Sequence, residues 1–237
     1  MNARDDDGTR PASGSIAGHE RLTGDLVPIE VDVLAASAPT AAVALLGALL
    51  VRTDPDASGG RVVARIVETE AYHEDDPASH SHARRTARSE PMFWGPGTAY
   101  VYRSYGVHWC LNVTVEPAET GAAVLVRAAR VIDGIEVVRG RRATARTDRE
   151  LLRGPGRLTA GLAVDGPTHD RTDLLDPAAS LHVAADGWRP AADAIRQGPR
   201  VGVTHAPDLA WRWWLADAPE VSPYRRSPRA HPAPPAG

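Results

Sequence analysis

Lysine is absent from this sequence, and all 27 of its basic side chains are therefore arginine. A lysine amine is the usual side-chain partner for imine chemistry, so such chemistry would need the terminal amine here. Cysteine is almost as scarce, because Cys110 is the only one in 237 residues. A single cysteine excludes an internal disulfide framework and a zinc site built on several thiolates.

Long apolar runs are missing as well: no stretch reaches the roughly 18 residues that span a bilayer. The chain begins MNARDDDGTR, which is acidic where a secretory signal peptide would be basic and then apolar. We therefore expect a cytoplasmic protein that makes no membrane contact. A mean hydropathy of -0.29 and a hydrophobic content of 43% fit a chain with a buried core, and 237 residues fit one large domain.

Charge is unevenly distributed along the chain. The net charge of -3 at pH 7 by itself disfavours nucleic-acid binding. Residues 84–157, however, carry 13 arginines against 7 acidic residues, a local excess of 6 positive charges. Such a basic segment is either a solvated face or a binding site for phosphate groups, and charge alone does not choose between the two.

Apolar periodicity and turn residues predict an α+β fold, in which helices flank one mixed, largely antiparallel β-sheet. Helices are expected at residues 40–50, 130–142 and 158–164. Strands are expected at residues 61–70, 100–104, 107–115, 122–129, 181–184, 200–203 and 210–215. The second and third of these strands meet at a tight turn and should form a protruding hairpin. Residues 1–24 and 223–237 are polar or proline-rich, so we expect two disordered tails around a folded domain at residues 25–222.

Two carboxylates lie in the strand predicted at residues 61–70. Because successive side chains of a strand point to opposite faces, Glu68 and Glu70 are expected to share one face. Glu70 ends the strand just before a long polar loop, where a carboxylate can reach a cleft and act as general base on water. A surface glutamate paired with an arginine is the competing interpretation, and spacing alone does not choose between Glu68 and Glu70.

The polar loop after this strand contains three histidines, His73, His80 and His82, with Asp75 and Asp76 beside them. Such side chains can bind a metal ion, and the H-x-H spacing can chelate. The H-E-x-x-H pattern and the cysteine partners of a zinc deaminase are missing, however. We therefore expect no metal, and expect one of the histidines to stack on a ligand or to hydrogen-bond it.

Tyrosines gather around the predicted hairpin, although aromatic residues are only 5% of the chain. Tyr100 and Tyr102 share one strand face, and Tyr105 lies at the turn, where no core is available to it. An aromatic side chain at a hairpin tip beside a basic segment is typical of a wedge or stacking platform for nucleic acid. Core packing is the alternative, and it is favoured for Tyr100.

Two polar residues interrupt predicted apolar strands. Arg127, within AVLVRAAR, needs a carboxylate or phosphate partner, which a structural ion pair would also provide. Asn112, within CLNV, is either a satisfied buried amide or a group that contacts a base.

In their order along the chain, five segments closely resemble the alkyladenine (3-methyladenine) DNA glycosylase family: RIVETEAY, ASHSHARRT, MFWGPGTAYVYRSYGVHWCLNV, AVLVRA and RGPGRL. The likeness runs from about residue 34 to residue 215, is supported by PRVGV at 199–203, and leaves out both tails. It implies the family's single α+β domain, with a hairpin that intercalates into DNA. It also implies a monofunctional glycosylase of base excision repair that needs no cofactor.

The same resemblance implies roles for individual residues. Glu70 would be the general base that activates water, and Arg127 would position that water and a nearby phosphate. Tyr105 would fill the gap left by the extruded nucleotide. The base pocket would consist of Tyr72, His80, Tyr102 and Asn112. Extrusion costs a few kcal/mol, and it costs least for a damaged, weakly paired base, which favours alkylated or deaminated purines.

The implied partner is double-stranded DNA with a damaged purine, bound by a monomeric protein associated with the nucleoid. Because lysine is absent, cleavage of the abasic strand by lyase chemistry is not expected. Two other hypotheses compete with this one. The first is a non-catalytic nucleic-acid-binding module with the same hairpin, and the second is a metal-dependent hydrolase that uses the three histidines of the polar loop.

Overall fold

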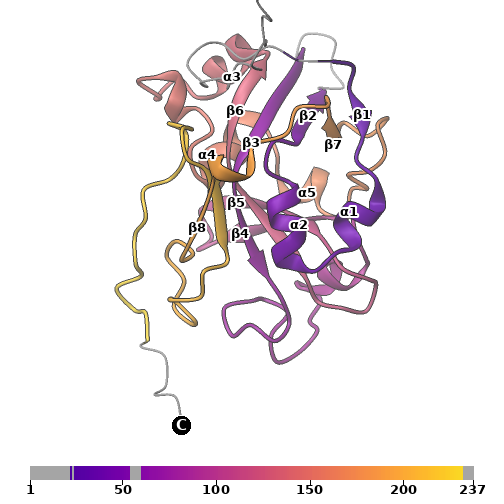
Figure 1. Cartoon of the computed structure of the whole chain (residues 1–237), viewed down its shortest axis with the longest axis vertical. Coiled ribbons are helices and arrows are strands. Elements are labelled where there is room, and N and C mark those ends of the chain that lie inside the picture. Colours follow the sequence, from indigo (N-terminus) through magenta and orange to yellow (C-terminus); the bar gives the residue numbers. More distant parts are fainter. Residues whose placement is uncertain (1–21, 23, 54–59, 232–237) are drawn as a thin grey trace, which may run out of the picture.

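One curled β-sheet with a few short helices forms the part of the chain that the structure describes (Figure 1). The structure is a computed structural model that describes residues 22, 24–53 and 60–231. Its strands are β1 (Val27–Pro28), β2 (Leu49–Thr53), β3 (Arg61–Tyr72), β4 (Ala99–Ser104), β5 (His108–Thr114), β6 (Ala123–Asp133), β7 (Leu181–Ala185), β8 (Ile195–Gly198) and β9 (Arg212–Leu215). Its α-helices are α1 (Val31–Ala35), α2 (Ala38–Ala44), α3 (Ile135–Arg141), α4 (Pro155–Leu162) and α5 (Gly166–His169). Short 3-10 helices are η1 (Glu90–Phe93), η2 (Asp148–Glu150) and η3 (Ala192–Ala194).

β3 is the central strand of this sheet, whose order is β1-β7-β2-β3-β6-β5-β4. One edge of β3 pairs with β6 along most of its length. The other edge is shared, because residues 61–65 pair with β2 and residues 68–70 pair with β9, which in turn pairs with β8. Each of the strand pairings between these elements is antiparallel. The predicted α+β architecture with a largely antiparallel sheet is therefore confirmed, but these pairings do not make the sheet mixed.

A hydrophobic core lies between the helices and the sheet. α1 and α2 lie side by side in front of the sheet in Figure 1, and α2 packs against β3. α4 packs against β5 and β6 and contributes Leu158 and Leu162 to the same buried cluster. The apolar residues of these short helices therefore fix the position of the sheet. The polar side chains of β3 project from that sheet.

A β-bulge in β3 changes which of its side chains face the core. Before the bulge, the side chains in the main core are those of Val62, Ala64 and Ile66. The pairing with β6 shifts between Ile66 and Glu68, and after this shift the core side chains are those of Val67 and Ala71. Glu68 and Glu70 therefore point away from the core, since a bulge re-aims the side chains that follow it.

The predicted hairpin is confirmed as β4 and β5, which pair from Ala99 opposite Val113 to Ser104 opposite His108. At its tip, the amide of Val107 donates to the carbonyl of Ser104 over 3.0 Å. The two central residues of this turn, Tyr105 and Gly106, have positive φ angles of 50° and 70°. Positive φ at both positions is the hallmark of the tight turns that suit the twist of a hairpin.

Two predicted elements are wrong in part, and a third is wrong throughout. Of the helix predicted at 40–50, α2 ends at Ala44 and residues 49–53 form β2, because a short apolar run fits a buried helix and a buried strand equally well. Of the helix predicted at 130–142, residues 130–133 still belong to β6, and Gly134 with a φ of 77° precedes α3. Residues 200–203 form no strand, since Gly202 has a φ of 74° and the nearest strand is β8.

The two ends of the chain are described to different extents. The tail predicted at residues 1–24 lies outside the described residues, except for residues 22 and 24. Residues 223–231 are described, have no helix or strand, and run beside the loop at 200–208. Within the described ranges, no helix is both long enough and apolar enough to cross a bilayer.

The junction between β6 and α3 gives a direct test of the fold. A Cβ added at Gly134 would lie 2.3 Å from the carbonyl oxygen of Arg61, and the positive φ also disfavours a side chain. We expect Gly134→Ala to lower the free energy of unfolding by more than about 1 kcal/mol, measured by urea denaturation. Gly140→Ala in α3 is the matched control, because an added Cβ there meets nothing within 4 Å. It should leave stability unchanged or raise it by up to about 1 kcal/mol, and equal losses in both variants would contradict the fold at Gly134.

Candidate active site

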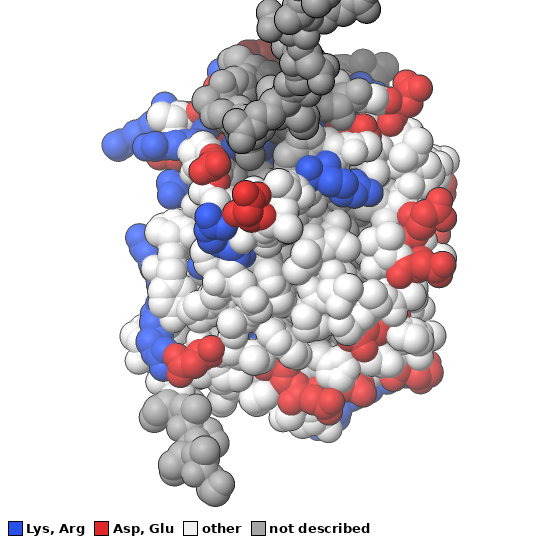
Figure 2. Space-filling model, viewed as in Figure 1, with Lys and Arg blue, Asp and Glu red and all other residues white. Residues whose placement is uncertain are grey.

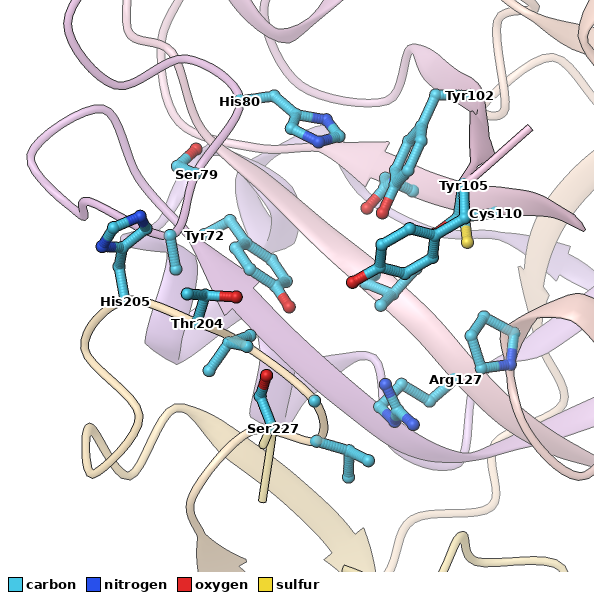
Figure 3. Close-up of a pocket in the computed structure, with 18 of the residues that line it drawn as sticks. Tyr72, Ser79, His80, Tyr102, Tyr105, Cys110, Arg127, Thr204, His205 and Ser227 are labelled. Atoms are coloured by element: carbon cyan, nitrogen blue, oxygen red, sulfur yellow. The ribbon is translucent and has the colours of Figure 1, made fainter. Parts of the chain in front are cut away.

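A cavity of about 880 Å³ lies between the hairpin, the end of β3 and the loop at 200–205. Its size is typical of a ligand-binding cleft. Six of the seven predicted site residues line it: Tyr72, His80, Tyr102, Tyr105, Asn112 and Arg127. Figure 3 shows His80 and Tyr102 on one side of this cavity and Thr204 and His205 on the other. The seventh residue, Glu70, is fully buried directly behind the lining.

Glu70 is held by three hydrogen bonds. The hydroxyl of Tyr72 donates to Oε2 over 2.8 Å, and Nη1 of Arg127 donates to the same oxygen over 3.2 Å. The amide of Val201 donates to Oε1 over 2.7 Å. All three partners line the cavity, so the Glu70 carboxylate is separated from the cavity by a single layer of side chains.

Glu68 shares a partner with Glu70 but has different surroundings. Nε of Arg127 donates to its Oε1 over 3.2 Å, and Nε of Arg212 donates to the same oxygen over 2.7 Å. The amide of Ser222 donates to Oε2 over 2.9 Å. Of these three partners only Arg127 lines the cavity, so Glu68 is linked to the cavity wall through Arg127 alone.

Arg127 joins the two carboxylates across the sheet. Glu68 lies opposite Ala128 and Thr69 lies opposite Val126, so Arg127 is the residue skipped by the pairing of β3 with β6. Although burial opposes its charge, the carboxylates of Glu70 and Glu68 raise the pKa of Arg127 above its usual value. Of the partners that the sequence left open for this mid-strand arginine, the structure shows carboxylates, and the guanidinium remains at the cavity wall.

Tyr72 is held at its hydroxyl group and at its ring. Its hydroxyl is bound to Glu70, and the guanidinium of Arg200 lies 4.6 Å from the centre of its ring. Arg200 is itself buried and is held by the Asp76 carboxylate and by the Ala71 carbonyl. Burial first, and then the Glu70 charge, raise the pKa of Tyr72 well above 10.0, so the phenol remains a proton donor.

His80 faces Tyr102 and is bound to Tyr100. Its Nδ1 is 2.8 Å from the Tyr100 hydroxyl, and its ring meets the Tyr102 ring edge-on at 4.5 Å between centres. Although part of the residue is exposed, the partial burial of its ring, and then the positive charge of Arg88, lower the pKa of His80 from 6.5 to about 4. At neutral pH this imidazole is therefore uncharged, with Nε2 available to a ligand.

Asn112 lines the same cavity. Its Nδ2 donates to the carbonyl of Tyr100 over 2.9 Å, and the residue is only 4% exposed. This bond across the hairpin fixes the orientation of the amide. Asn112 is thus both a satisfied strand residue and part of the cavity lining.

Tyr105 differs from the other lining residues because it is 89% exposed. Its φ of 50° is a conformation that a bulky side chain rarely adopts, at a cost of roughly 1–2 kcal/mol. Such a strained residue at a prominent tip indicates a function rather than a contribution to stability. In Figure 3 its ring extends from the hairpin across the cavity.

Comparison with known proteins identifies the family of this chain. The sequence description of the methylpurine-DNA glycosylase (MPG) family matches residues 32–219. The chain belongs to the methylpurine-DNA glycosylase family. Membership makes it a DNA glycosylase, a hydrolase of DNA repair, and confirms the resemblance seen in the five sequence segments.

Relatives agree with this assignment over most of their length. A Nocardia farcinica protein named "Putative 3-methyladenine DNA glycosylase" is 49% identical over 208 residues, which are 85% of this chain and 94% of that protein. Proteins with the same name from Streptomyces avermitilis and Mycobacterium tuberculosis are each 41% identical. They are covered over 93% and 97% of their lengths, with 85% of this chain aligned in both cases.

Other cavity residues were not predicted from the sequence. Val201 supplies an amide to Glu70, and Arg200 supports Tyr72 from behind the lining. Both lie in PRVGV, a segment whose sequence supports the family resemblance but indicates no role for either residue. Arg88 lines the cavity with its guanidinium 5.2 Å from the centre of the Tyr102 ring, and nothing in its sequence context pointed to that position. Residues 225–228, from the predicted tail, also line the cavity.

The three histidines of the polar loop do not converge. His80 faces the cavity, His82 Nδ1 is 2.9 Å from the Glu74 carbonyl, and His73 lies near Glu116 at 3.6 Å. Among the residues that the structure describes, no three His, Cys, Asp or Glu side chains are grouped as a metal site requires. The metal-dependent hydrolase therefore gains no support from this loop.

The depressed pKa of His80 predicts a titration that NMR can follow. Its imidazole resonance should stay in the neutral form from pH 7 to about pH 5 and titrate near pH 4. Because this pKa lies below the ordinary 6.5, the unfolded state binds the proton more readily. The contribution of His80 to stability is therefore complete above pH 6.5 and is lost as the pH falls toward 4. Arg88→Met should raise the pKa, and an imidazole that titrates near 6.5 in the unmodified protein would contradict this environment.

Proposed function

We propose that the protein is a monofunctional glycosylase for 3-methyladenine-type and deaminated purines, in which Glu70 activates the water that attacks the sugar. The observation that carries this proposal is the position of the Glu70 partners, all three of which line the cavity. Glu68 is the alternative base, but two of its partners lie away from the cavity. Its role is instead to hold Arg127 and Arg212.

The hydrogen bonds of Glu70 leave room for a water molecule. A carboxylate offers about four acceptor positions on its two oxygens. Oε2 uses two of them for Tyr72 and Arg127, whereas Oε1 uses one for the Val201 amide. One position on Oε1 is therefore left for a water, which the fixed carboxylate can orient and deprotonate.

In the proposed reaction the oxygen of this water bonds to C1′ of the sugar while its proton passes to Glu70. The N-glycosidic bond breaks, and its electron pair leaves with the base. An alkylated purine that is cationic in DNA leaves as a neutral molecule, so one carboxylate and one water are sufficient. The Arg127 guanidinium, beside Glu70 at the wall, positions the water and a nearby phosphate.

The cavity walls suit a flat extruded base. Tyr72 provides one aromatic surface, and His80 with Tyr102, which lie above it in Figure 3, provides another. Aromatic surfaces of this kind hold flipped bases by stacking. Neutral His80 can add a hydrogen bond, and Asn112 restricts the space beside the exocyclic group of a guanine. Tyr105 at the hairpin tip fills the gap that the extruded nucleotide leaves in the duplex. In this proposal the protein binds the duplex as a monomer in the cytoplasm.

Base release from methylated duplex DNA tests the proposed chemistry. With EDTA present throughout, the unmodified protein should release 3-methyladenine and leave the abasic strand intact. Glu70→Gln should still bind the duplex, but its rate should fall by about 100-fold or more, because a general base contributes about 10²–10⁴-fold. Binding without release by the unmodified protein would favour the non-catalytic binding module, and strand cleavage would contradict the monofunctional reaction.

Tyr105 should show opposite effects on stability and on DNA binding. Tyr105→Ala and Tyr105→Asn should both weaken binding to lesion duplex by about 5- to 150-fold, since a stacked aromatic is worth about 1–3 kcal/mol. Tyr105→Asn should also raise the free energy of unfolding by about 1 kcal/mol, because asparagine tolerates a positive φ better. Unchanged affinity in both variants would rule out the assignment of Tyr105 as the wedge.

A further inference from the structure

The C-terminal residues contribute an unexpected wall to the cavity. The family match ends at residue 219, yet Arg225, Arg226, Ser227 and Pro228 line the same cavity as Tyr72 and Arg127. Figure 3 shows Ser227 and Thr204 on the side of the cavity opposite Tyr102. We refer to residues 223–231 as the C-terminal arm.

The C-terminal arm is anchored although it has no helix or strand. The amide of Gly202 donates to the carbonyl of Arg225 over 2.9 Å, and the amide of His231 donates to the carbonyl of Thr204 over 3.0 Å. Between these two points, the Arg226 guanidinium is paired with the Asp208 carboxylate. The backbone of Arg225 is therefore held beside the same 200–204 loop that supplies the Val201 amide to Glu70.

The two arginines of the arm that line the cavity are in different situations. The charge of Arg226 is neutralised by Asp208. Arg225 is exposed, and within the described part of the chain its side chain makes no ion pair with a carboxylate. In Figure 2 arginines gather along the left side of the molecule, where the arm runs in Figure 1, and acidic residues gather along the right edge.

We propose that Arg225 binds a backbone phosphate next to the extruded nucleotide, so that the C-terminal arm closes on the lesion strand from the side opposite the hairpin. This inference rests on the proposed function, because it takes the strand that enters the cavity as its ligand. That ligand carries a phosphodiester on each side of the flipped sugar. An unpaired guanidinium on an anchored backbone at the cavity rim is a suitable partner for one of them.

Arg225→Gln tests this contact, and Arg229→Gln is the matched control. Arg229 is exposed in the same arm but does not line the cavity, so both variants lose one charge from the same segment. The probe is a duplex with a reduced abasic-site analogue, which has no glycosidic bond to cleave. An undamaged duplex of the same sequence is measured for comparison.

The salt dependence of binding gives the expected result. Loss of one phosphate contact should reduce the steepness of log K against log salt concentration by about 0.9. The ratio of the binding constant of the unmodified protein to that of the variant should therefore fall about 3.5-fold between about 50 and 200 mM salt. We expect this change for Arg225→Gln on the lesion duplex, a smaller one on the undamaged duplex, and none for Arg229→Gln.

Two results would overturn the inference. If Arg225→Gln and Arg229→Gln change the slope equally, the arm contributes only diffuse charge. If Arg225→Gln has the same slope and affinity as the unmodified protein, the arm does not bind phosphate at all. Base release by the unmodified protein tests the proposed function separately. Release without an Arg225 effect defeats this inference alone, whereas an Arg225 effect without release supports the phosphate contact and defeats the proposed glycosylase.

Discussion

The β-bulge in β3 is the constraint on which the site depends. Without the register shift between Ile66 and Glu68, strict alternation would continue the inward face of residues 62–66 through both glutamates. Two carboxylates would then enter an apolar core without partners, at a prohibitive cost. The bulge turns them instead toward Arg127 and the cavity, where each negative charge finds a guanidinium and a backbone amide. The extra residue at this bulge thus determines the direction in which Glu68 and Glu70 point.

The buried charges around Arg127 divide between structure and chemistry. Glu68 and Arg212 form the inner part of this network, and Glu70 forms the part next to the cavity. Removing one member of a buried ion pair typically costs about 3–5 kcal/mol, because its partner is left uncompensated. The inner pair therefore holds Arg127 in place, whereas Glu70 is the carboxylate that we propose takes a proton from water. Strain at Tyr105 follows the same logic, since its positive φ costs stability at a position on the cavity wall.

Sequence patterns predicted much of this structure, and the exceptions have physical causes. Apolar patterns and turn residues located β3, the hairpin and most of α4, because apolar runs of the expected lengths lie between strong turn signals. The choice between Glu68 and Glu70 could not be made in that way. It depends on the amides of Val201 and Ser222, which lie 131 and 154 positions away along the chain. The C-terminal arm could not be predicted either, because its order comes from contacts with the 200–208 loop rather than from its own composition.

We propose that Glu70 carries out the chemistry and that Glu68 supports the structure, and a comparison of Glu68→Gln with Glu70→Gln separates these two roles. Single-turnover base release is measured for each variant together with its free energy of unfolding, and the rate is expressed per folded molecule. Glu70→Gln should lose about 100-fold or more in rate, and Glu68→Gln should lose about 3–5 kcal/mol in stability with a rate within about tenfold of the unmodified protein. A Glu70→Gln variant that keeps its rate, with Glu68→Gln inactive although folded, would contradict the account and make Glu68 the base.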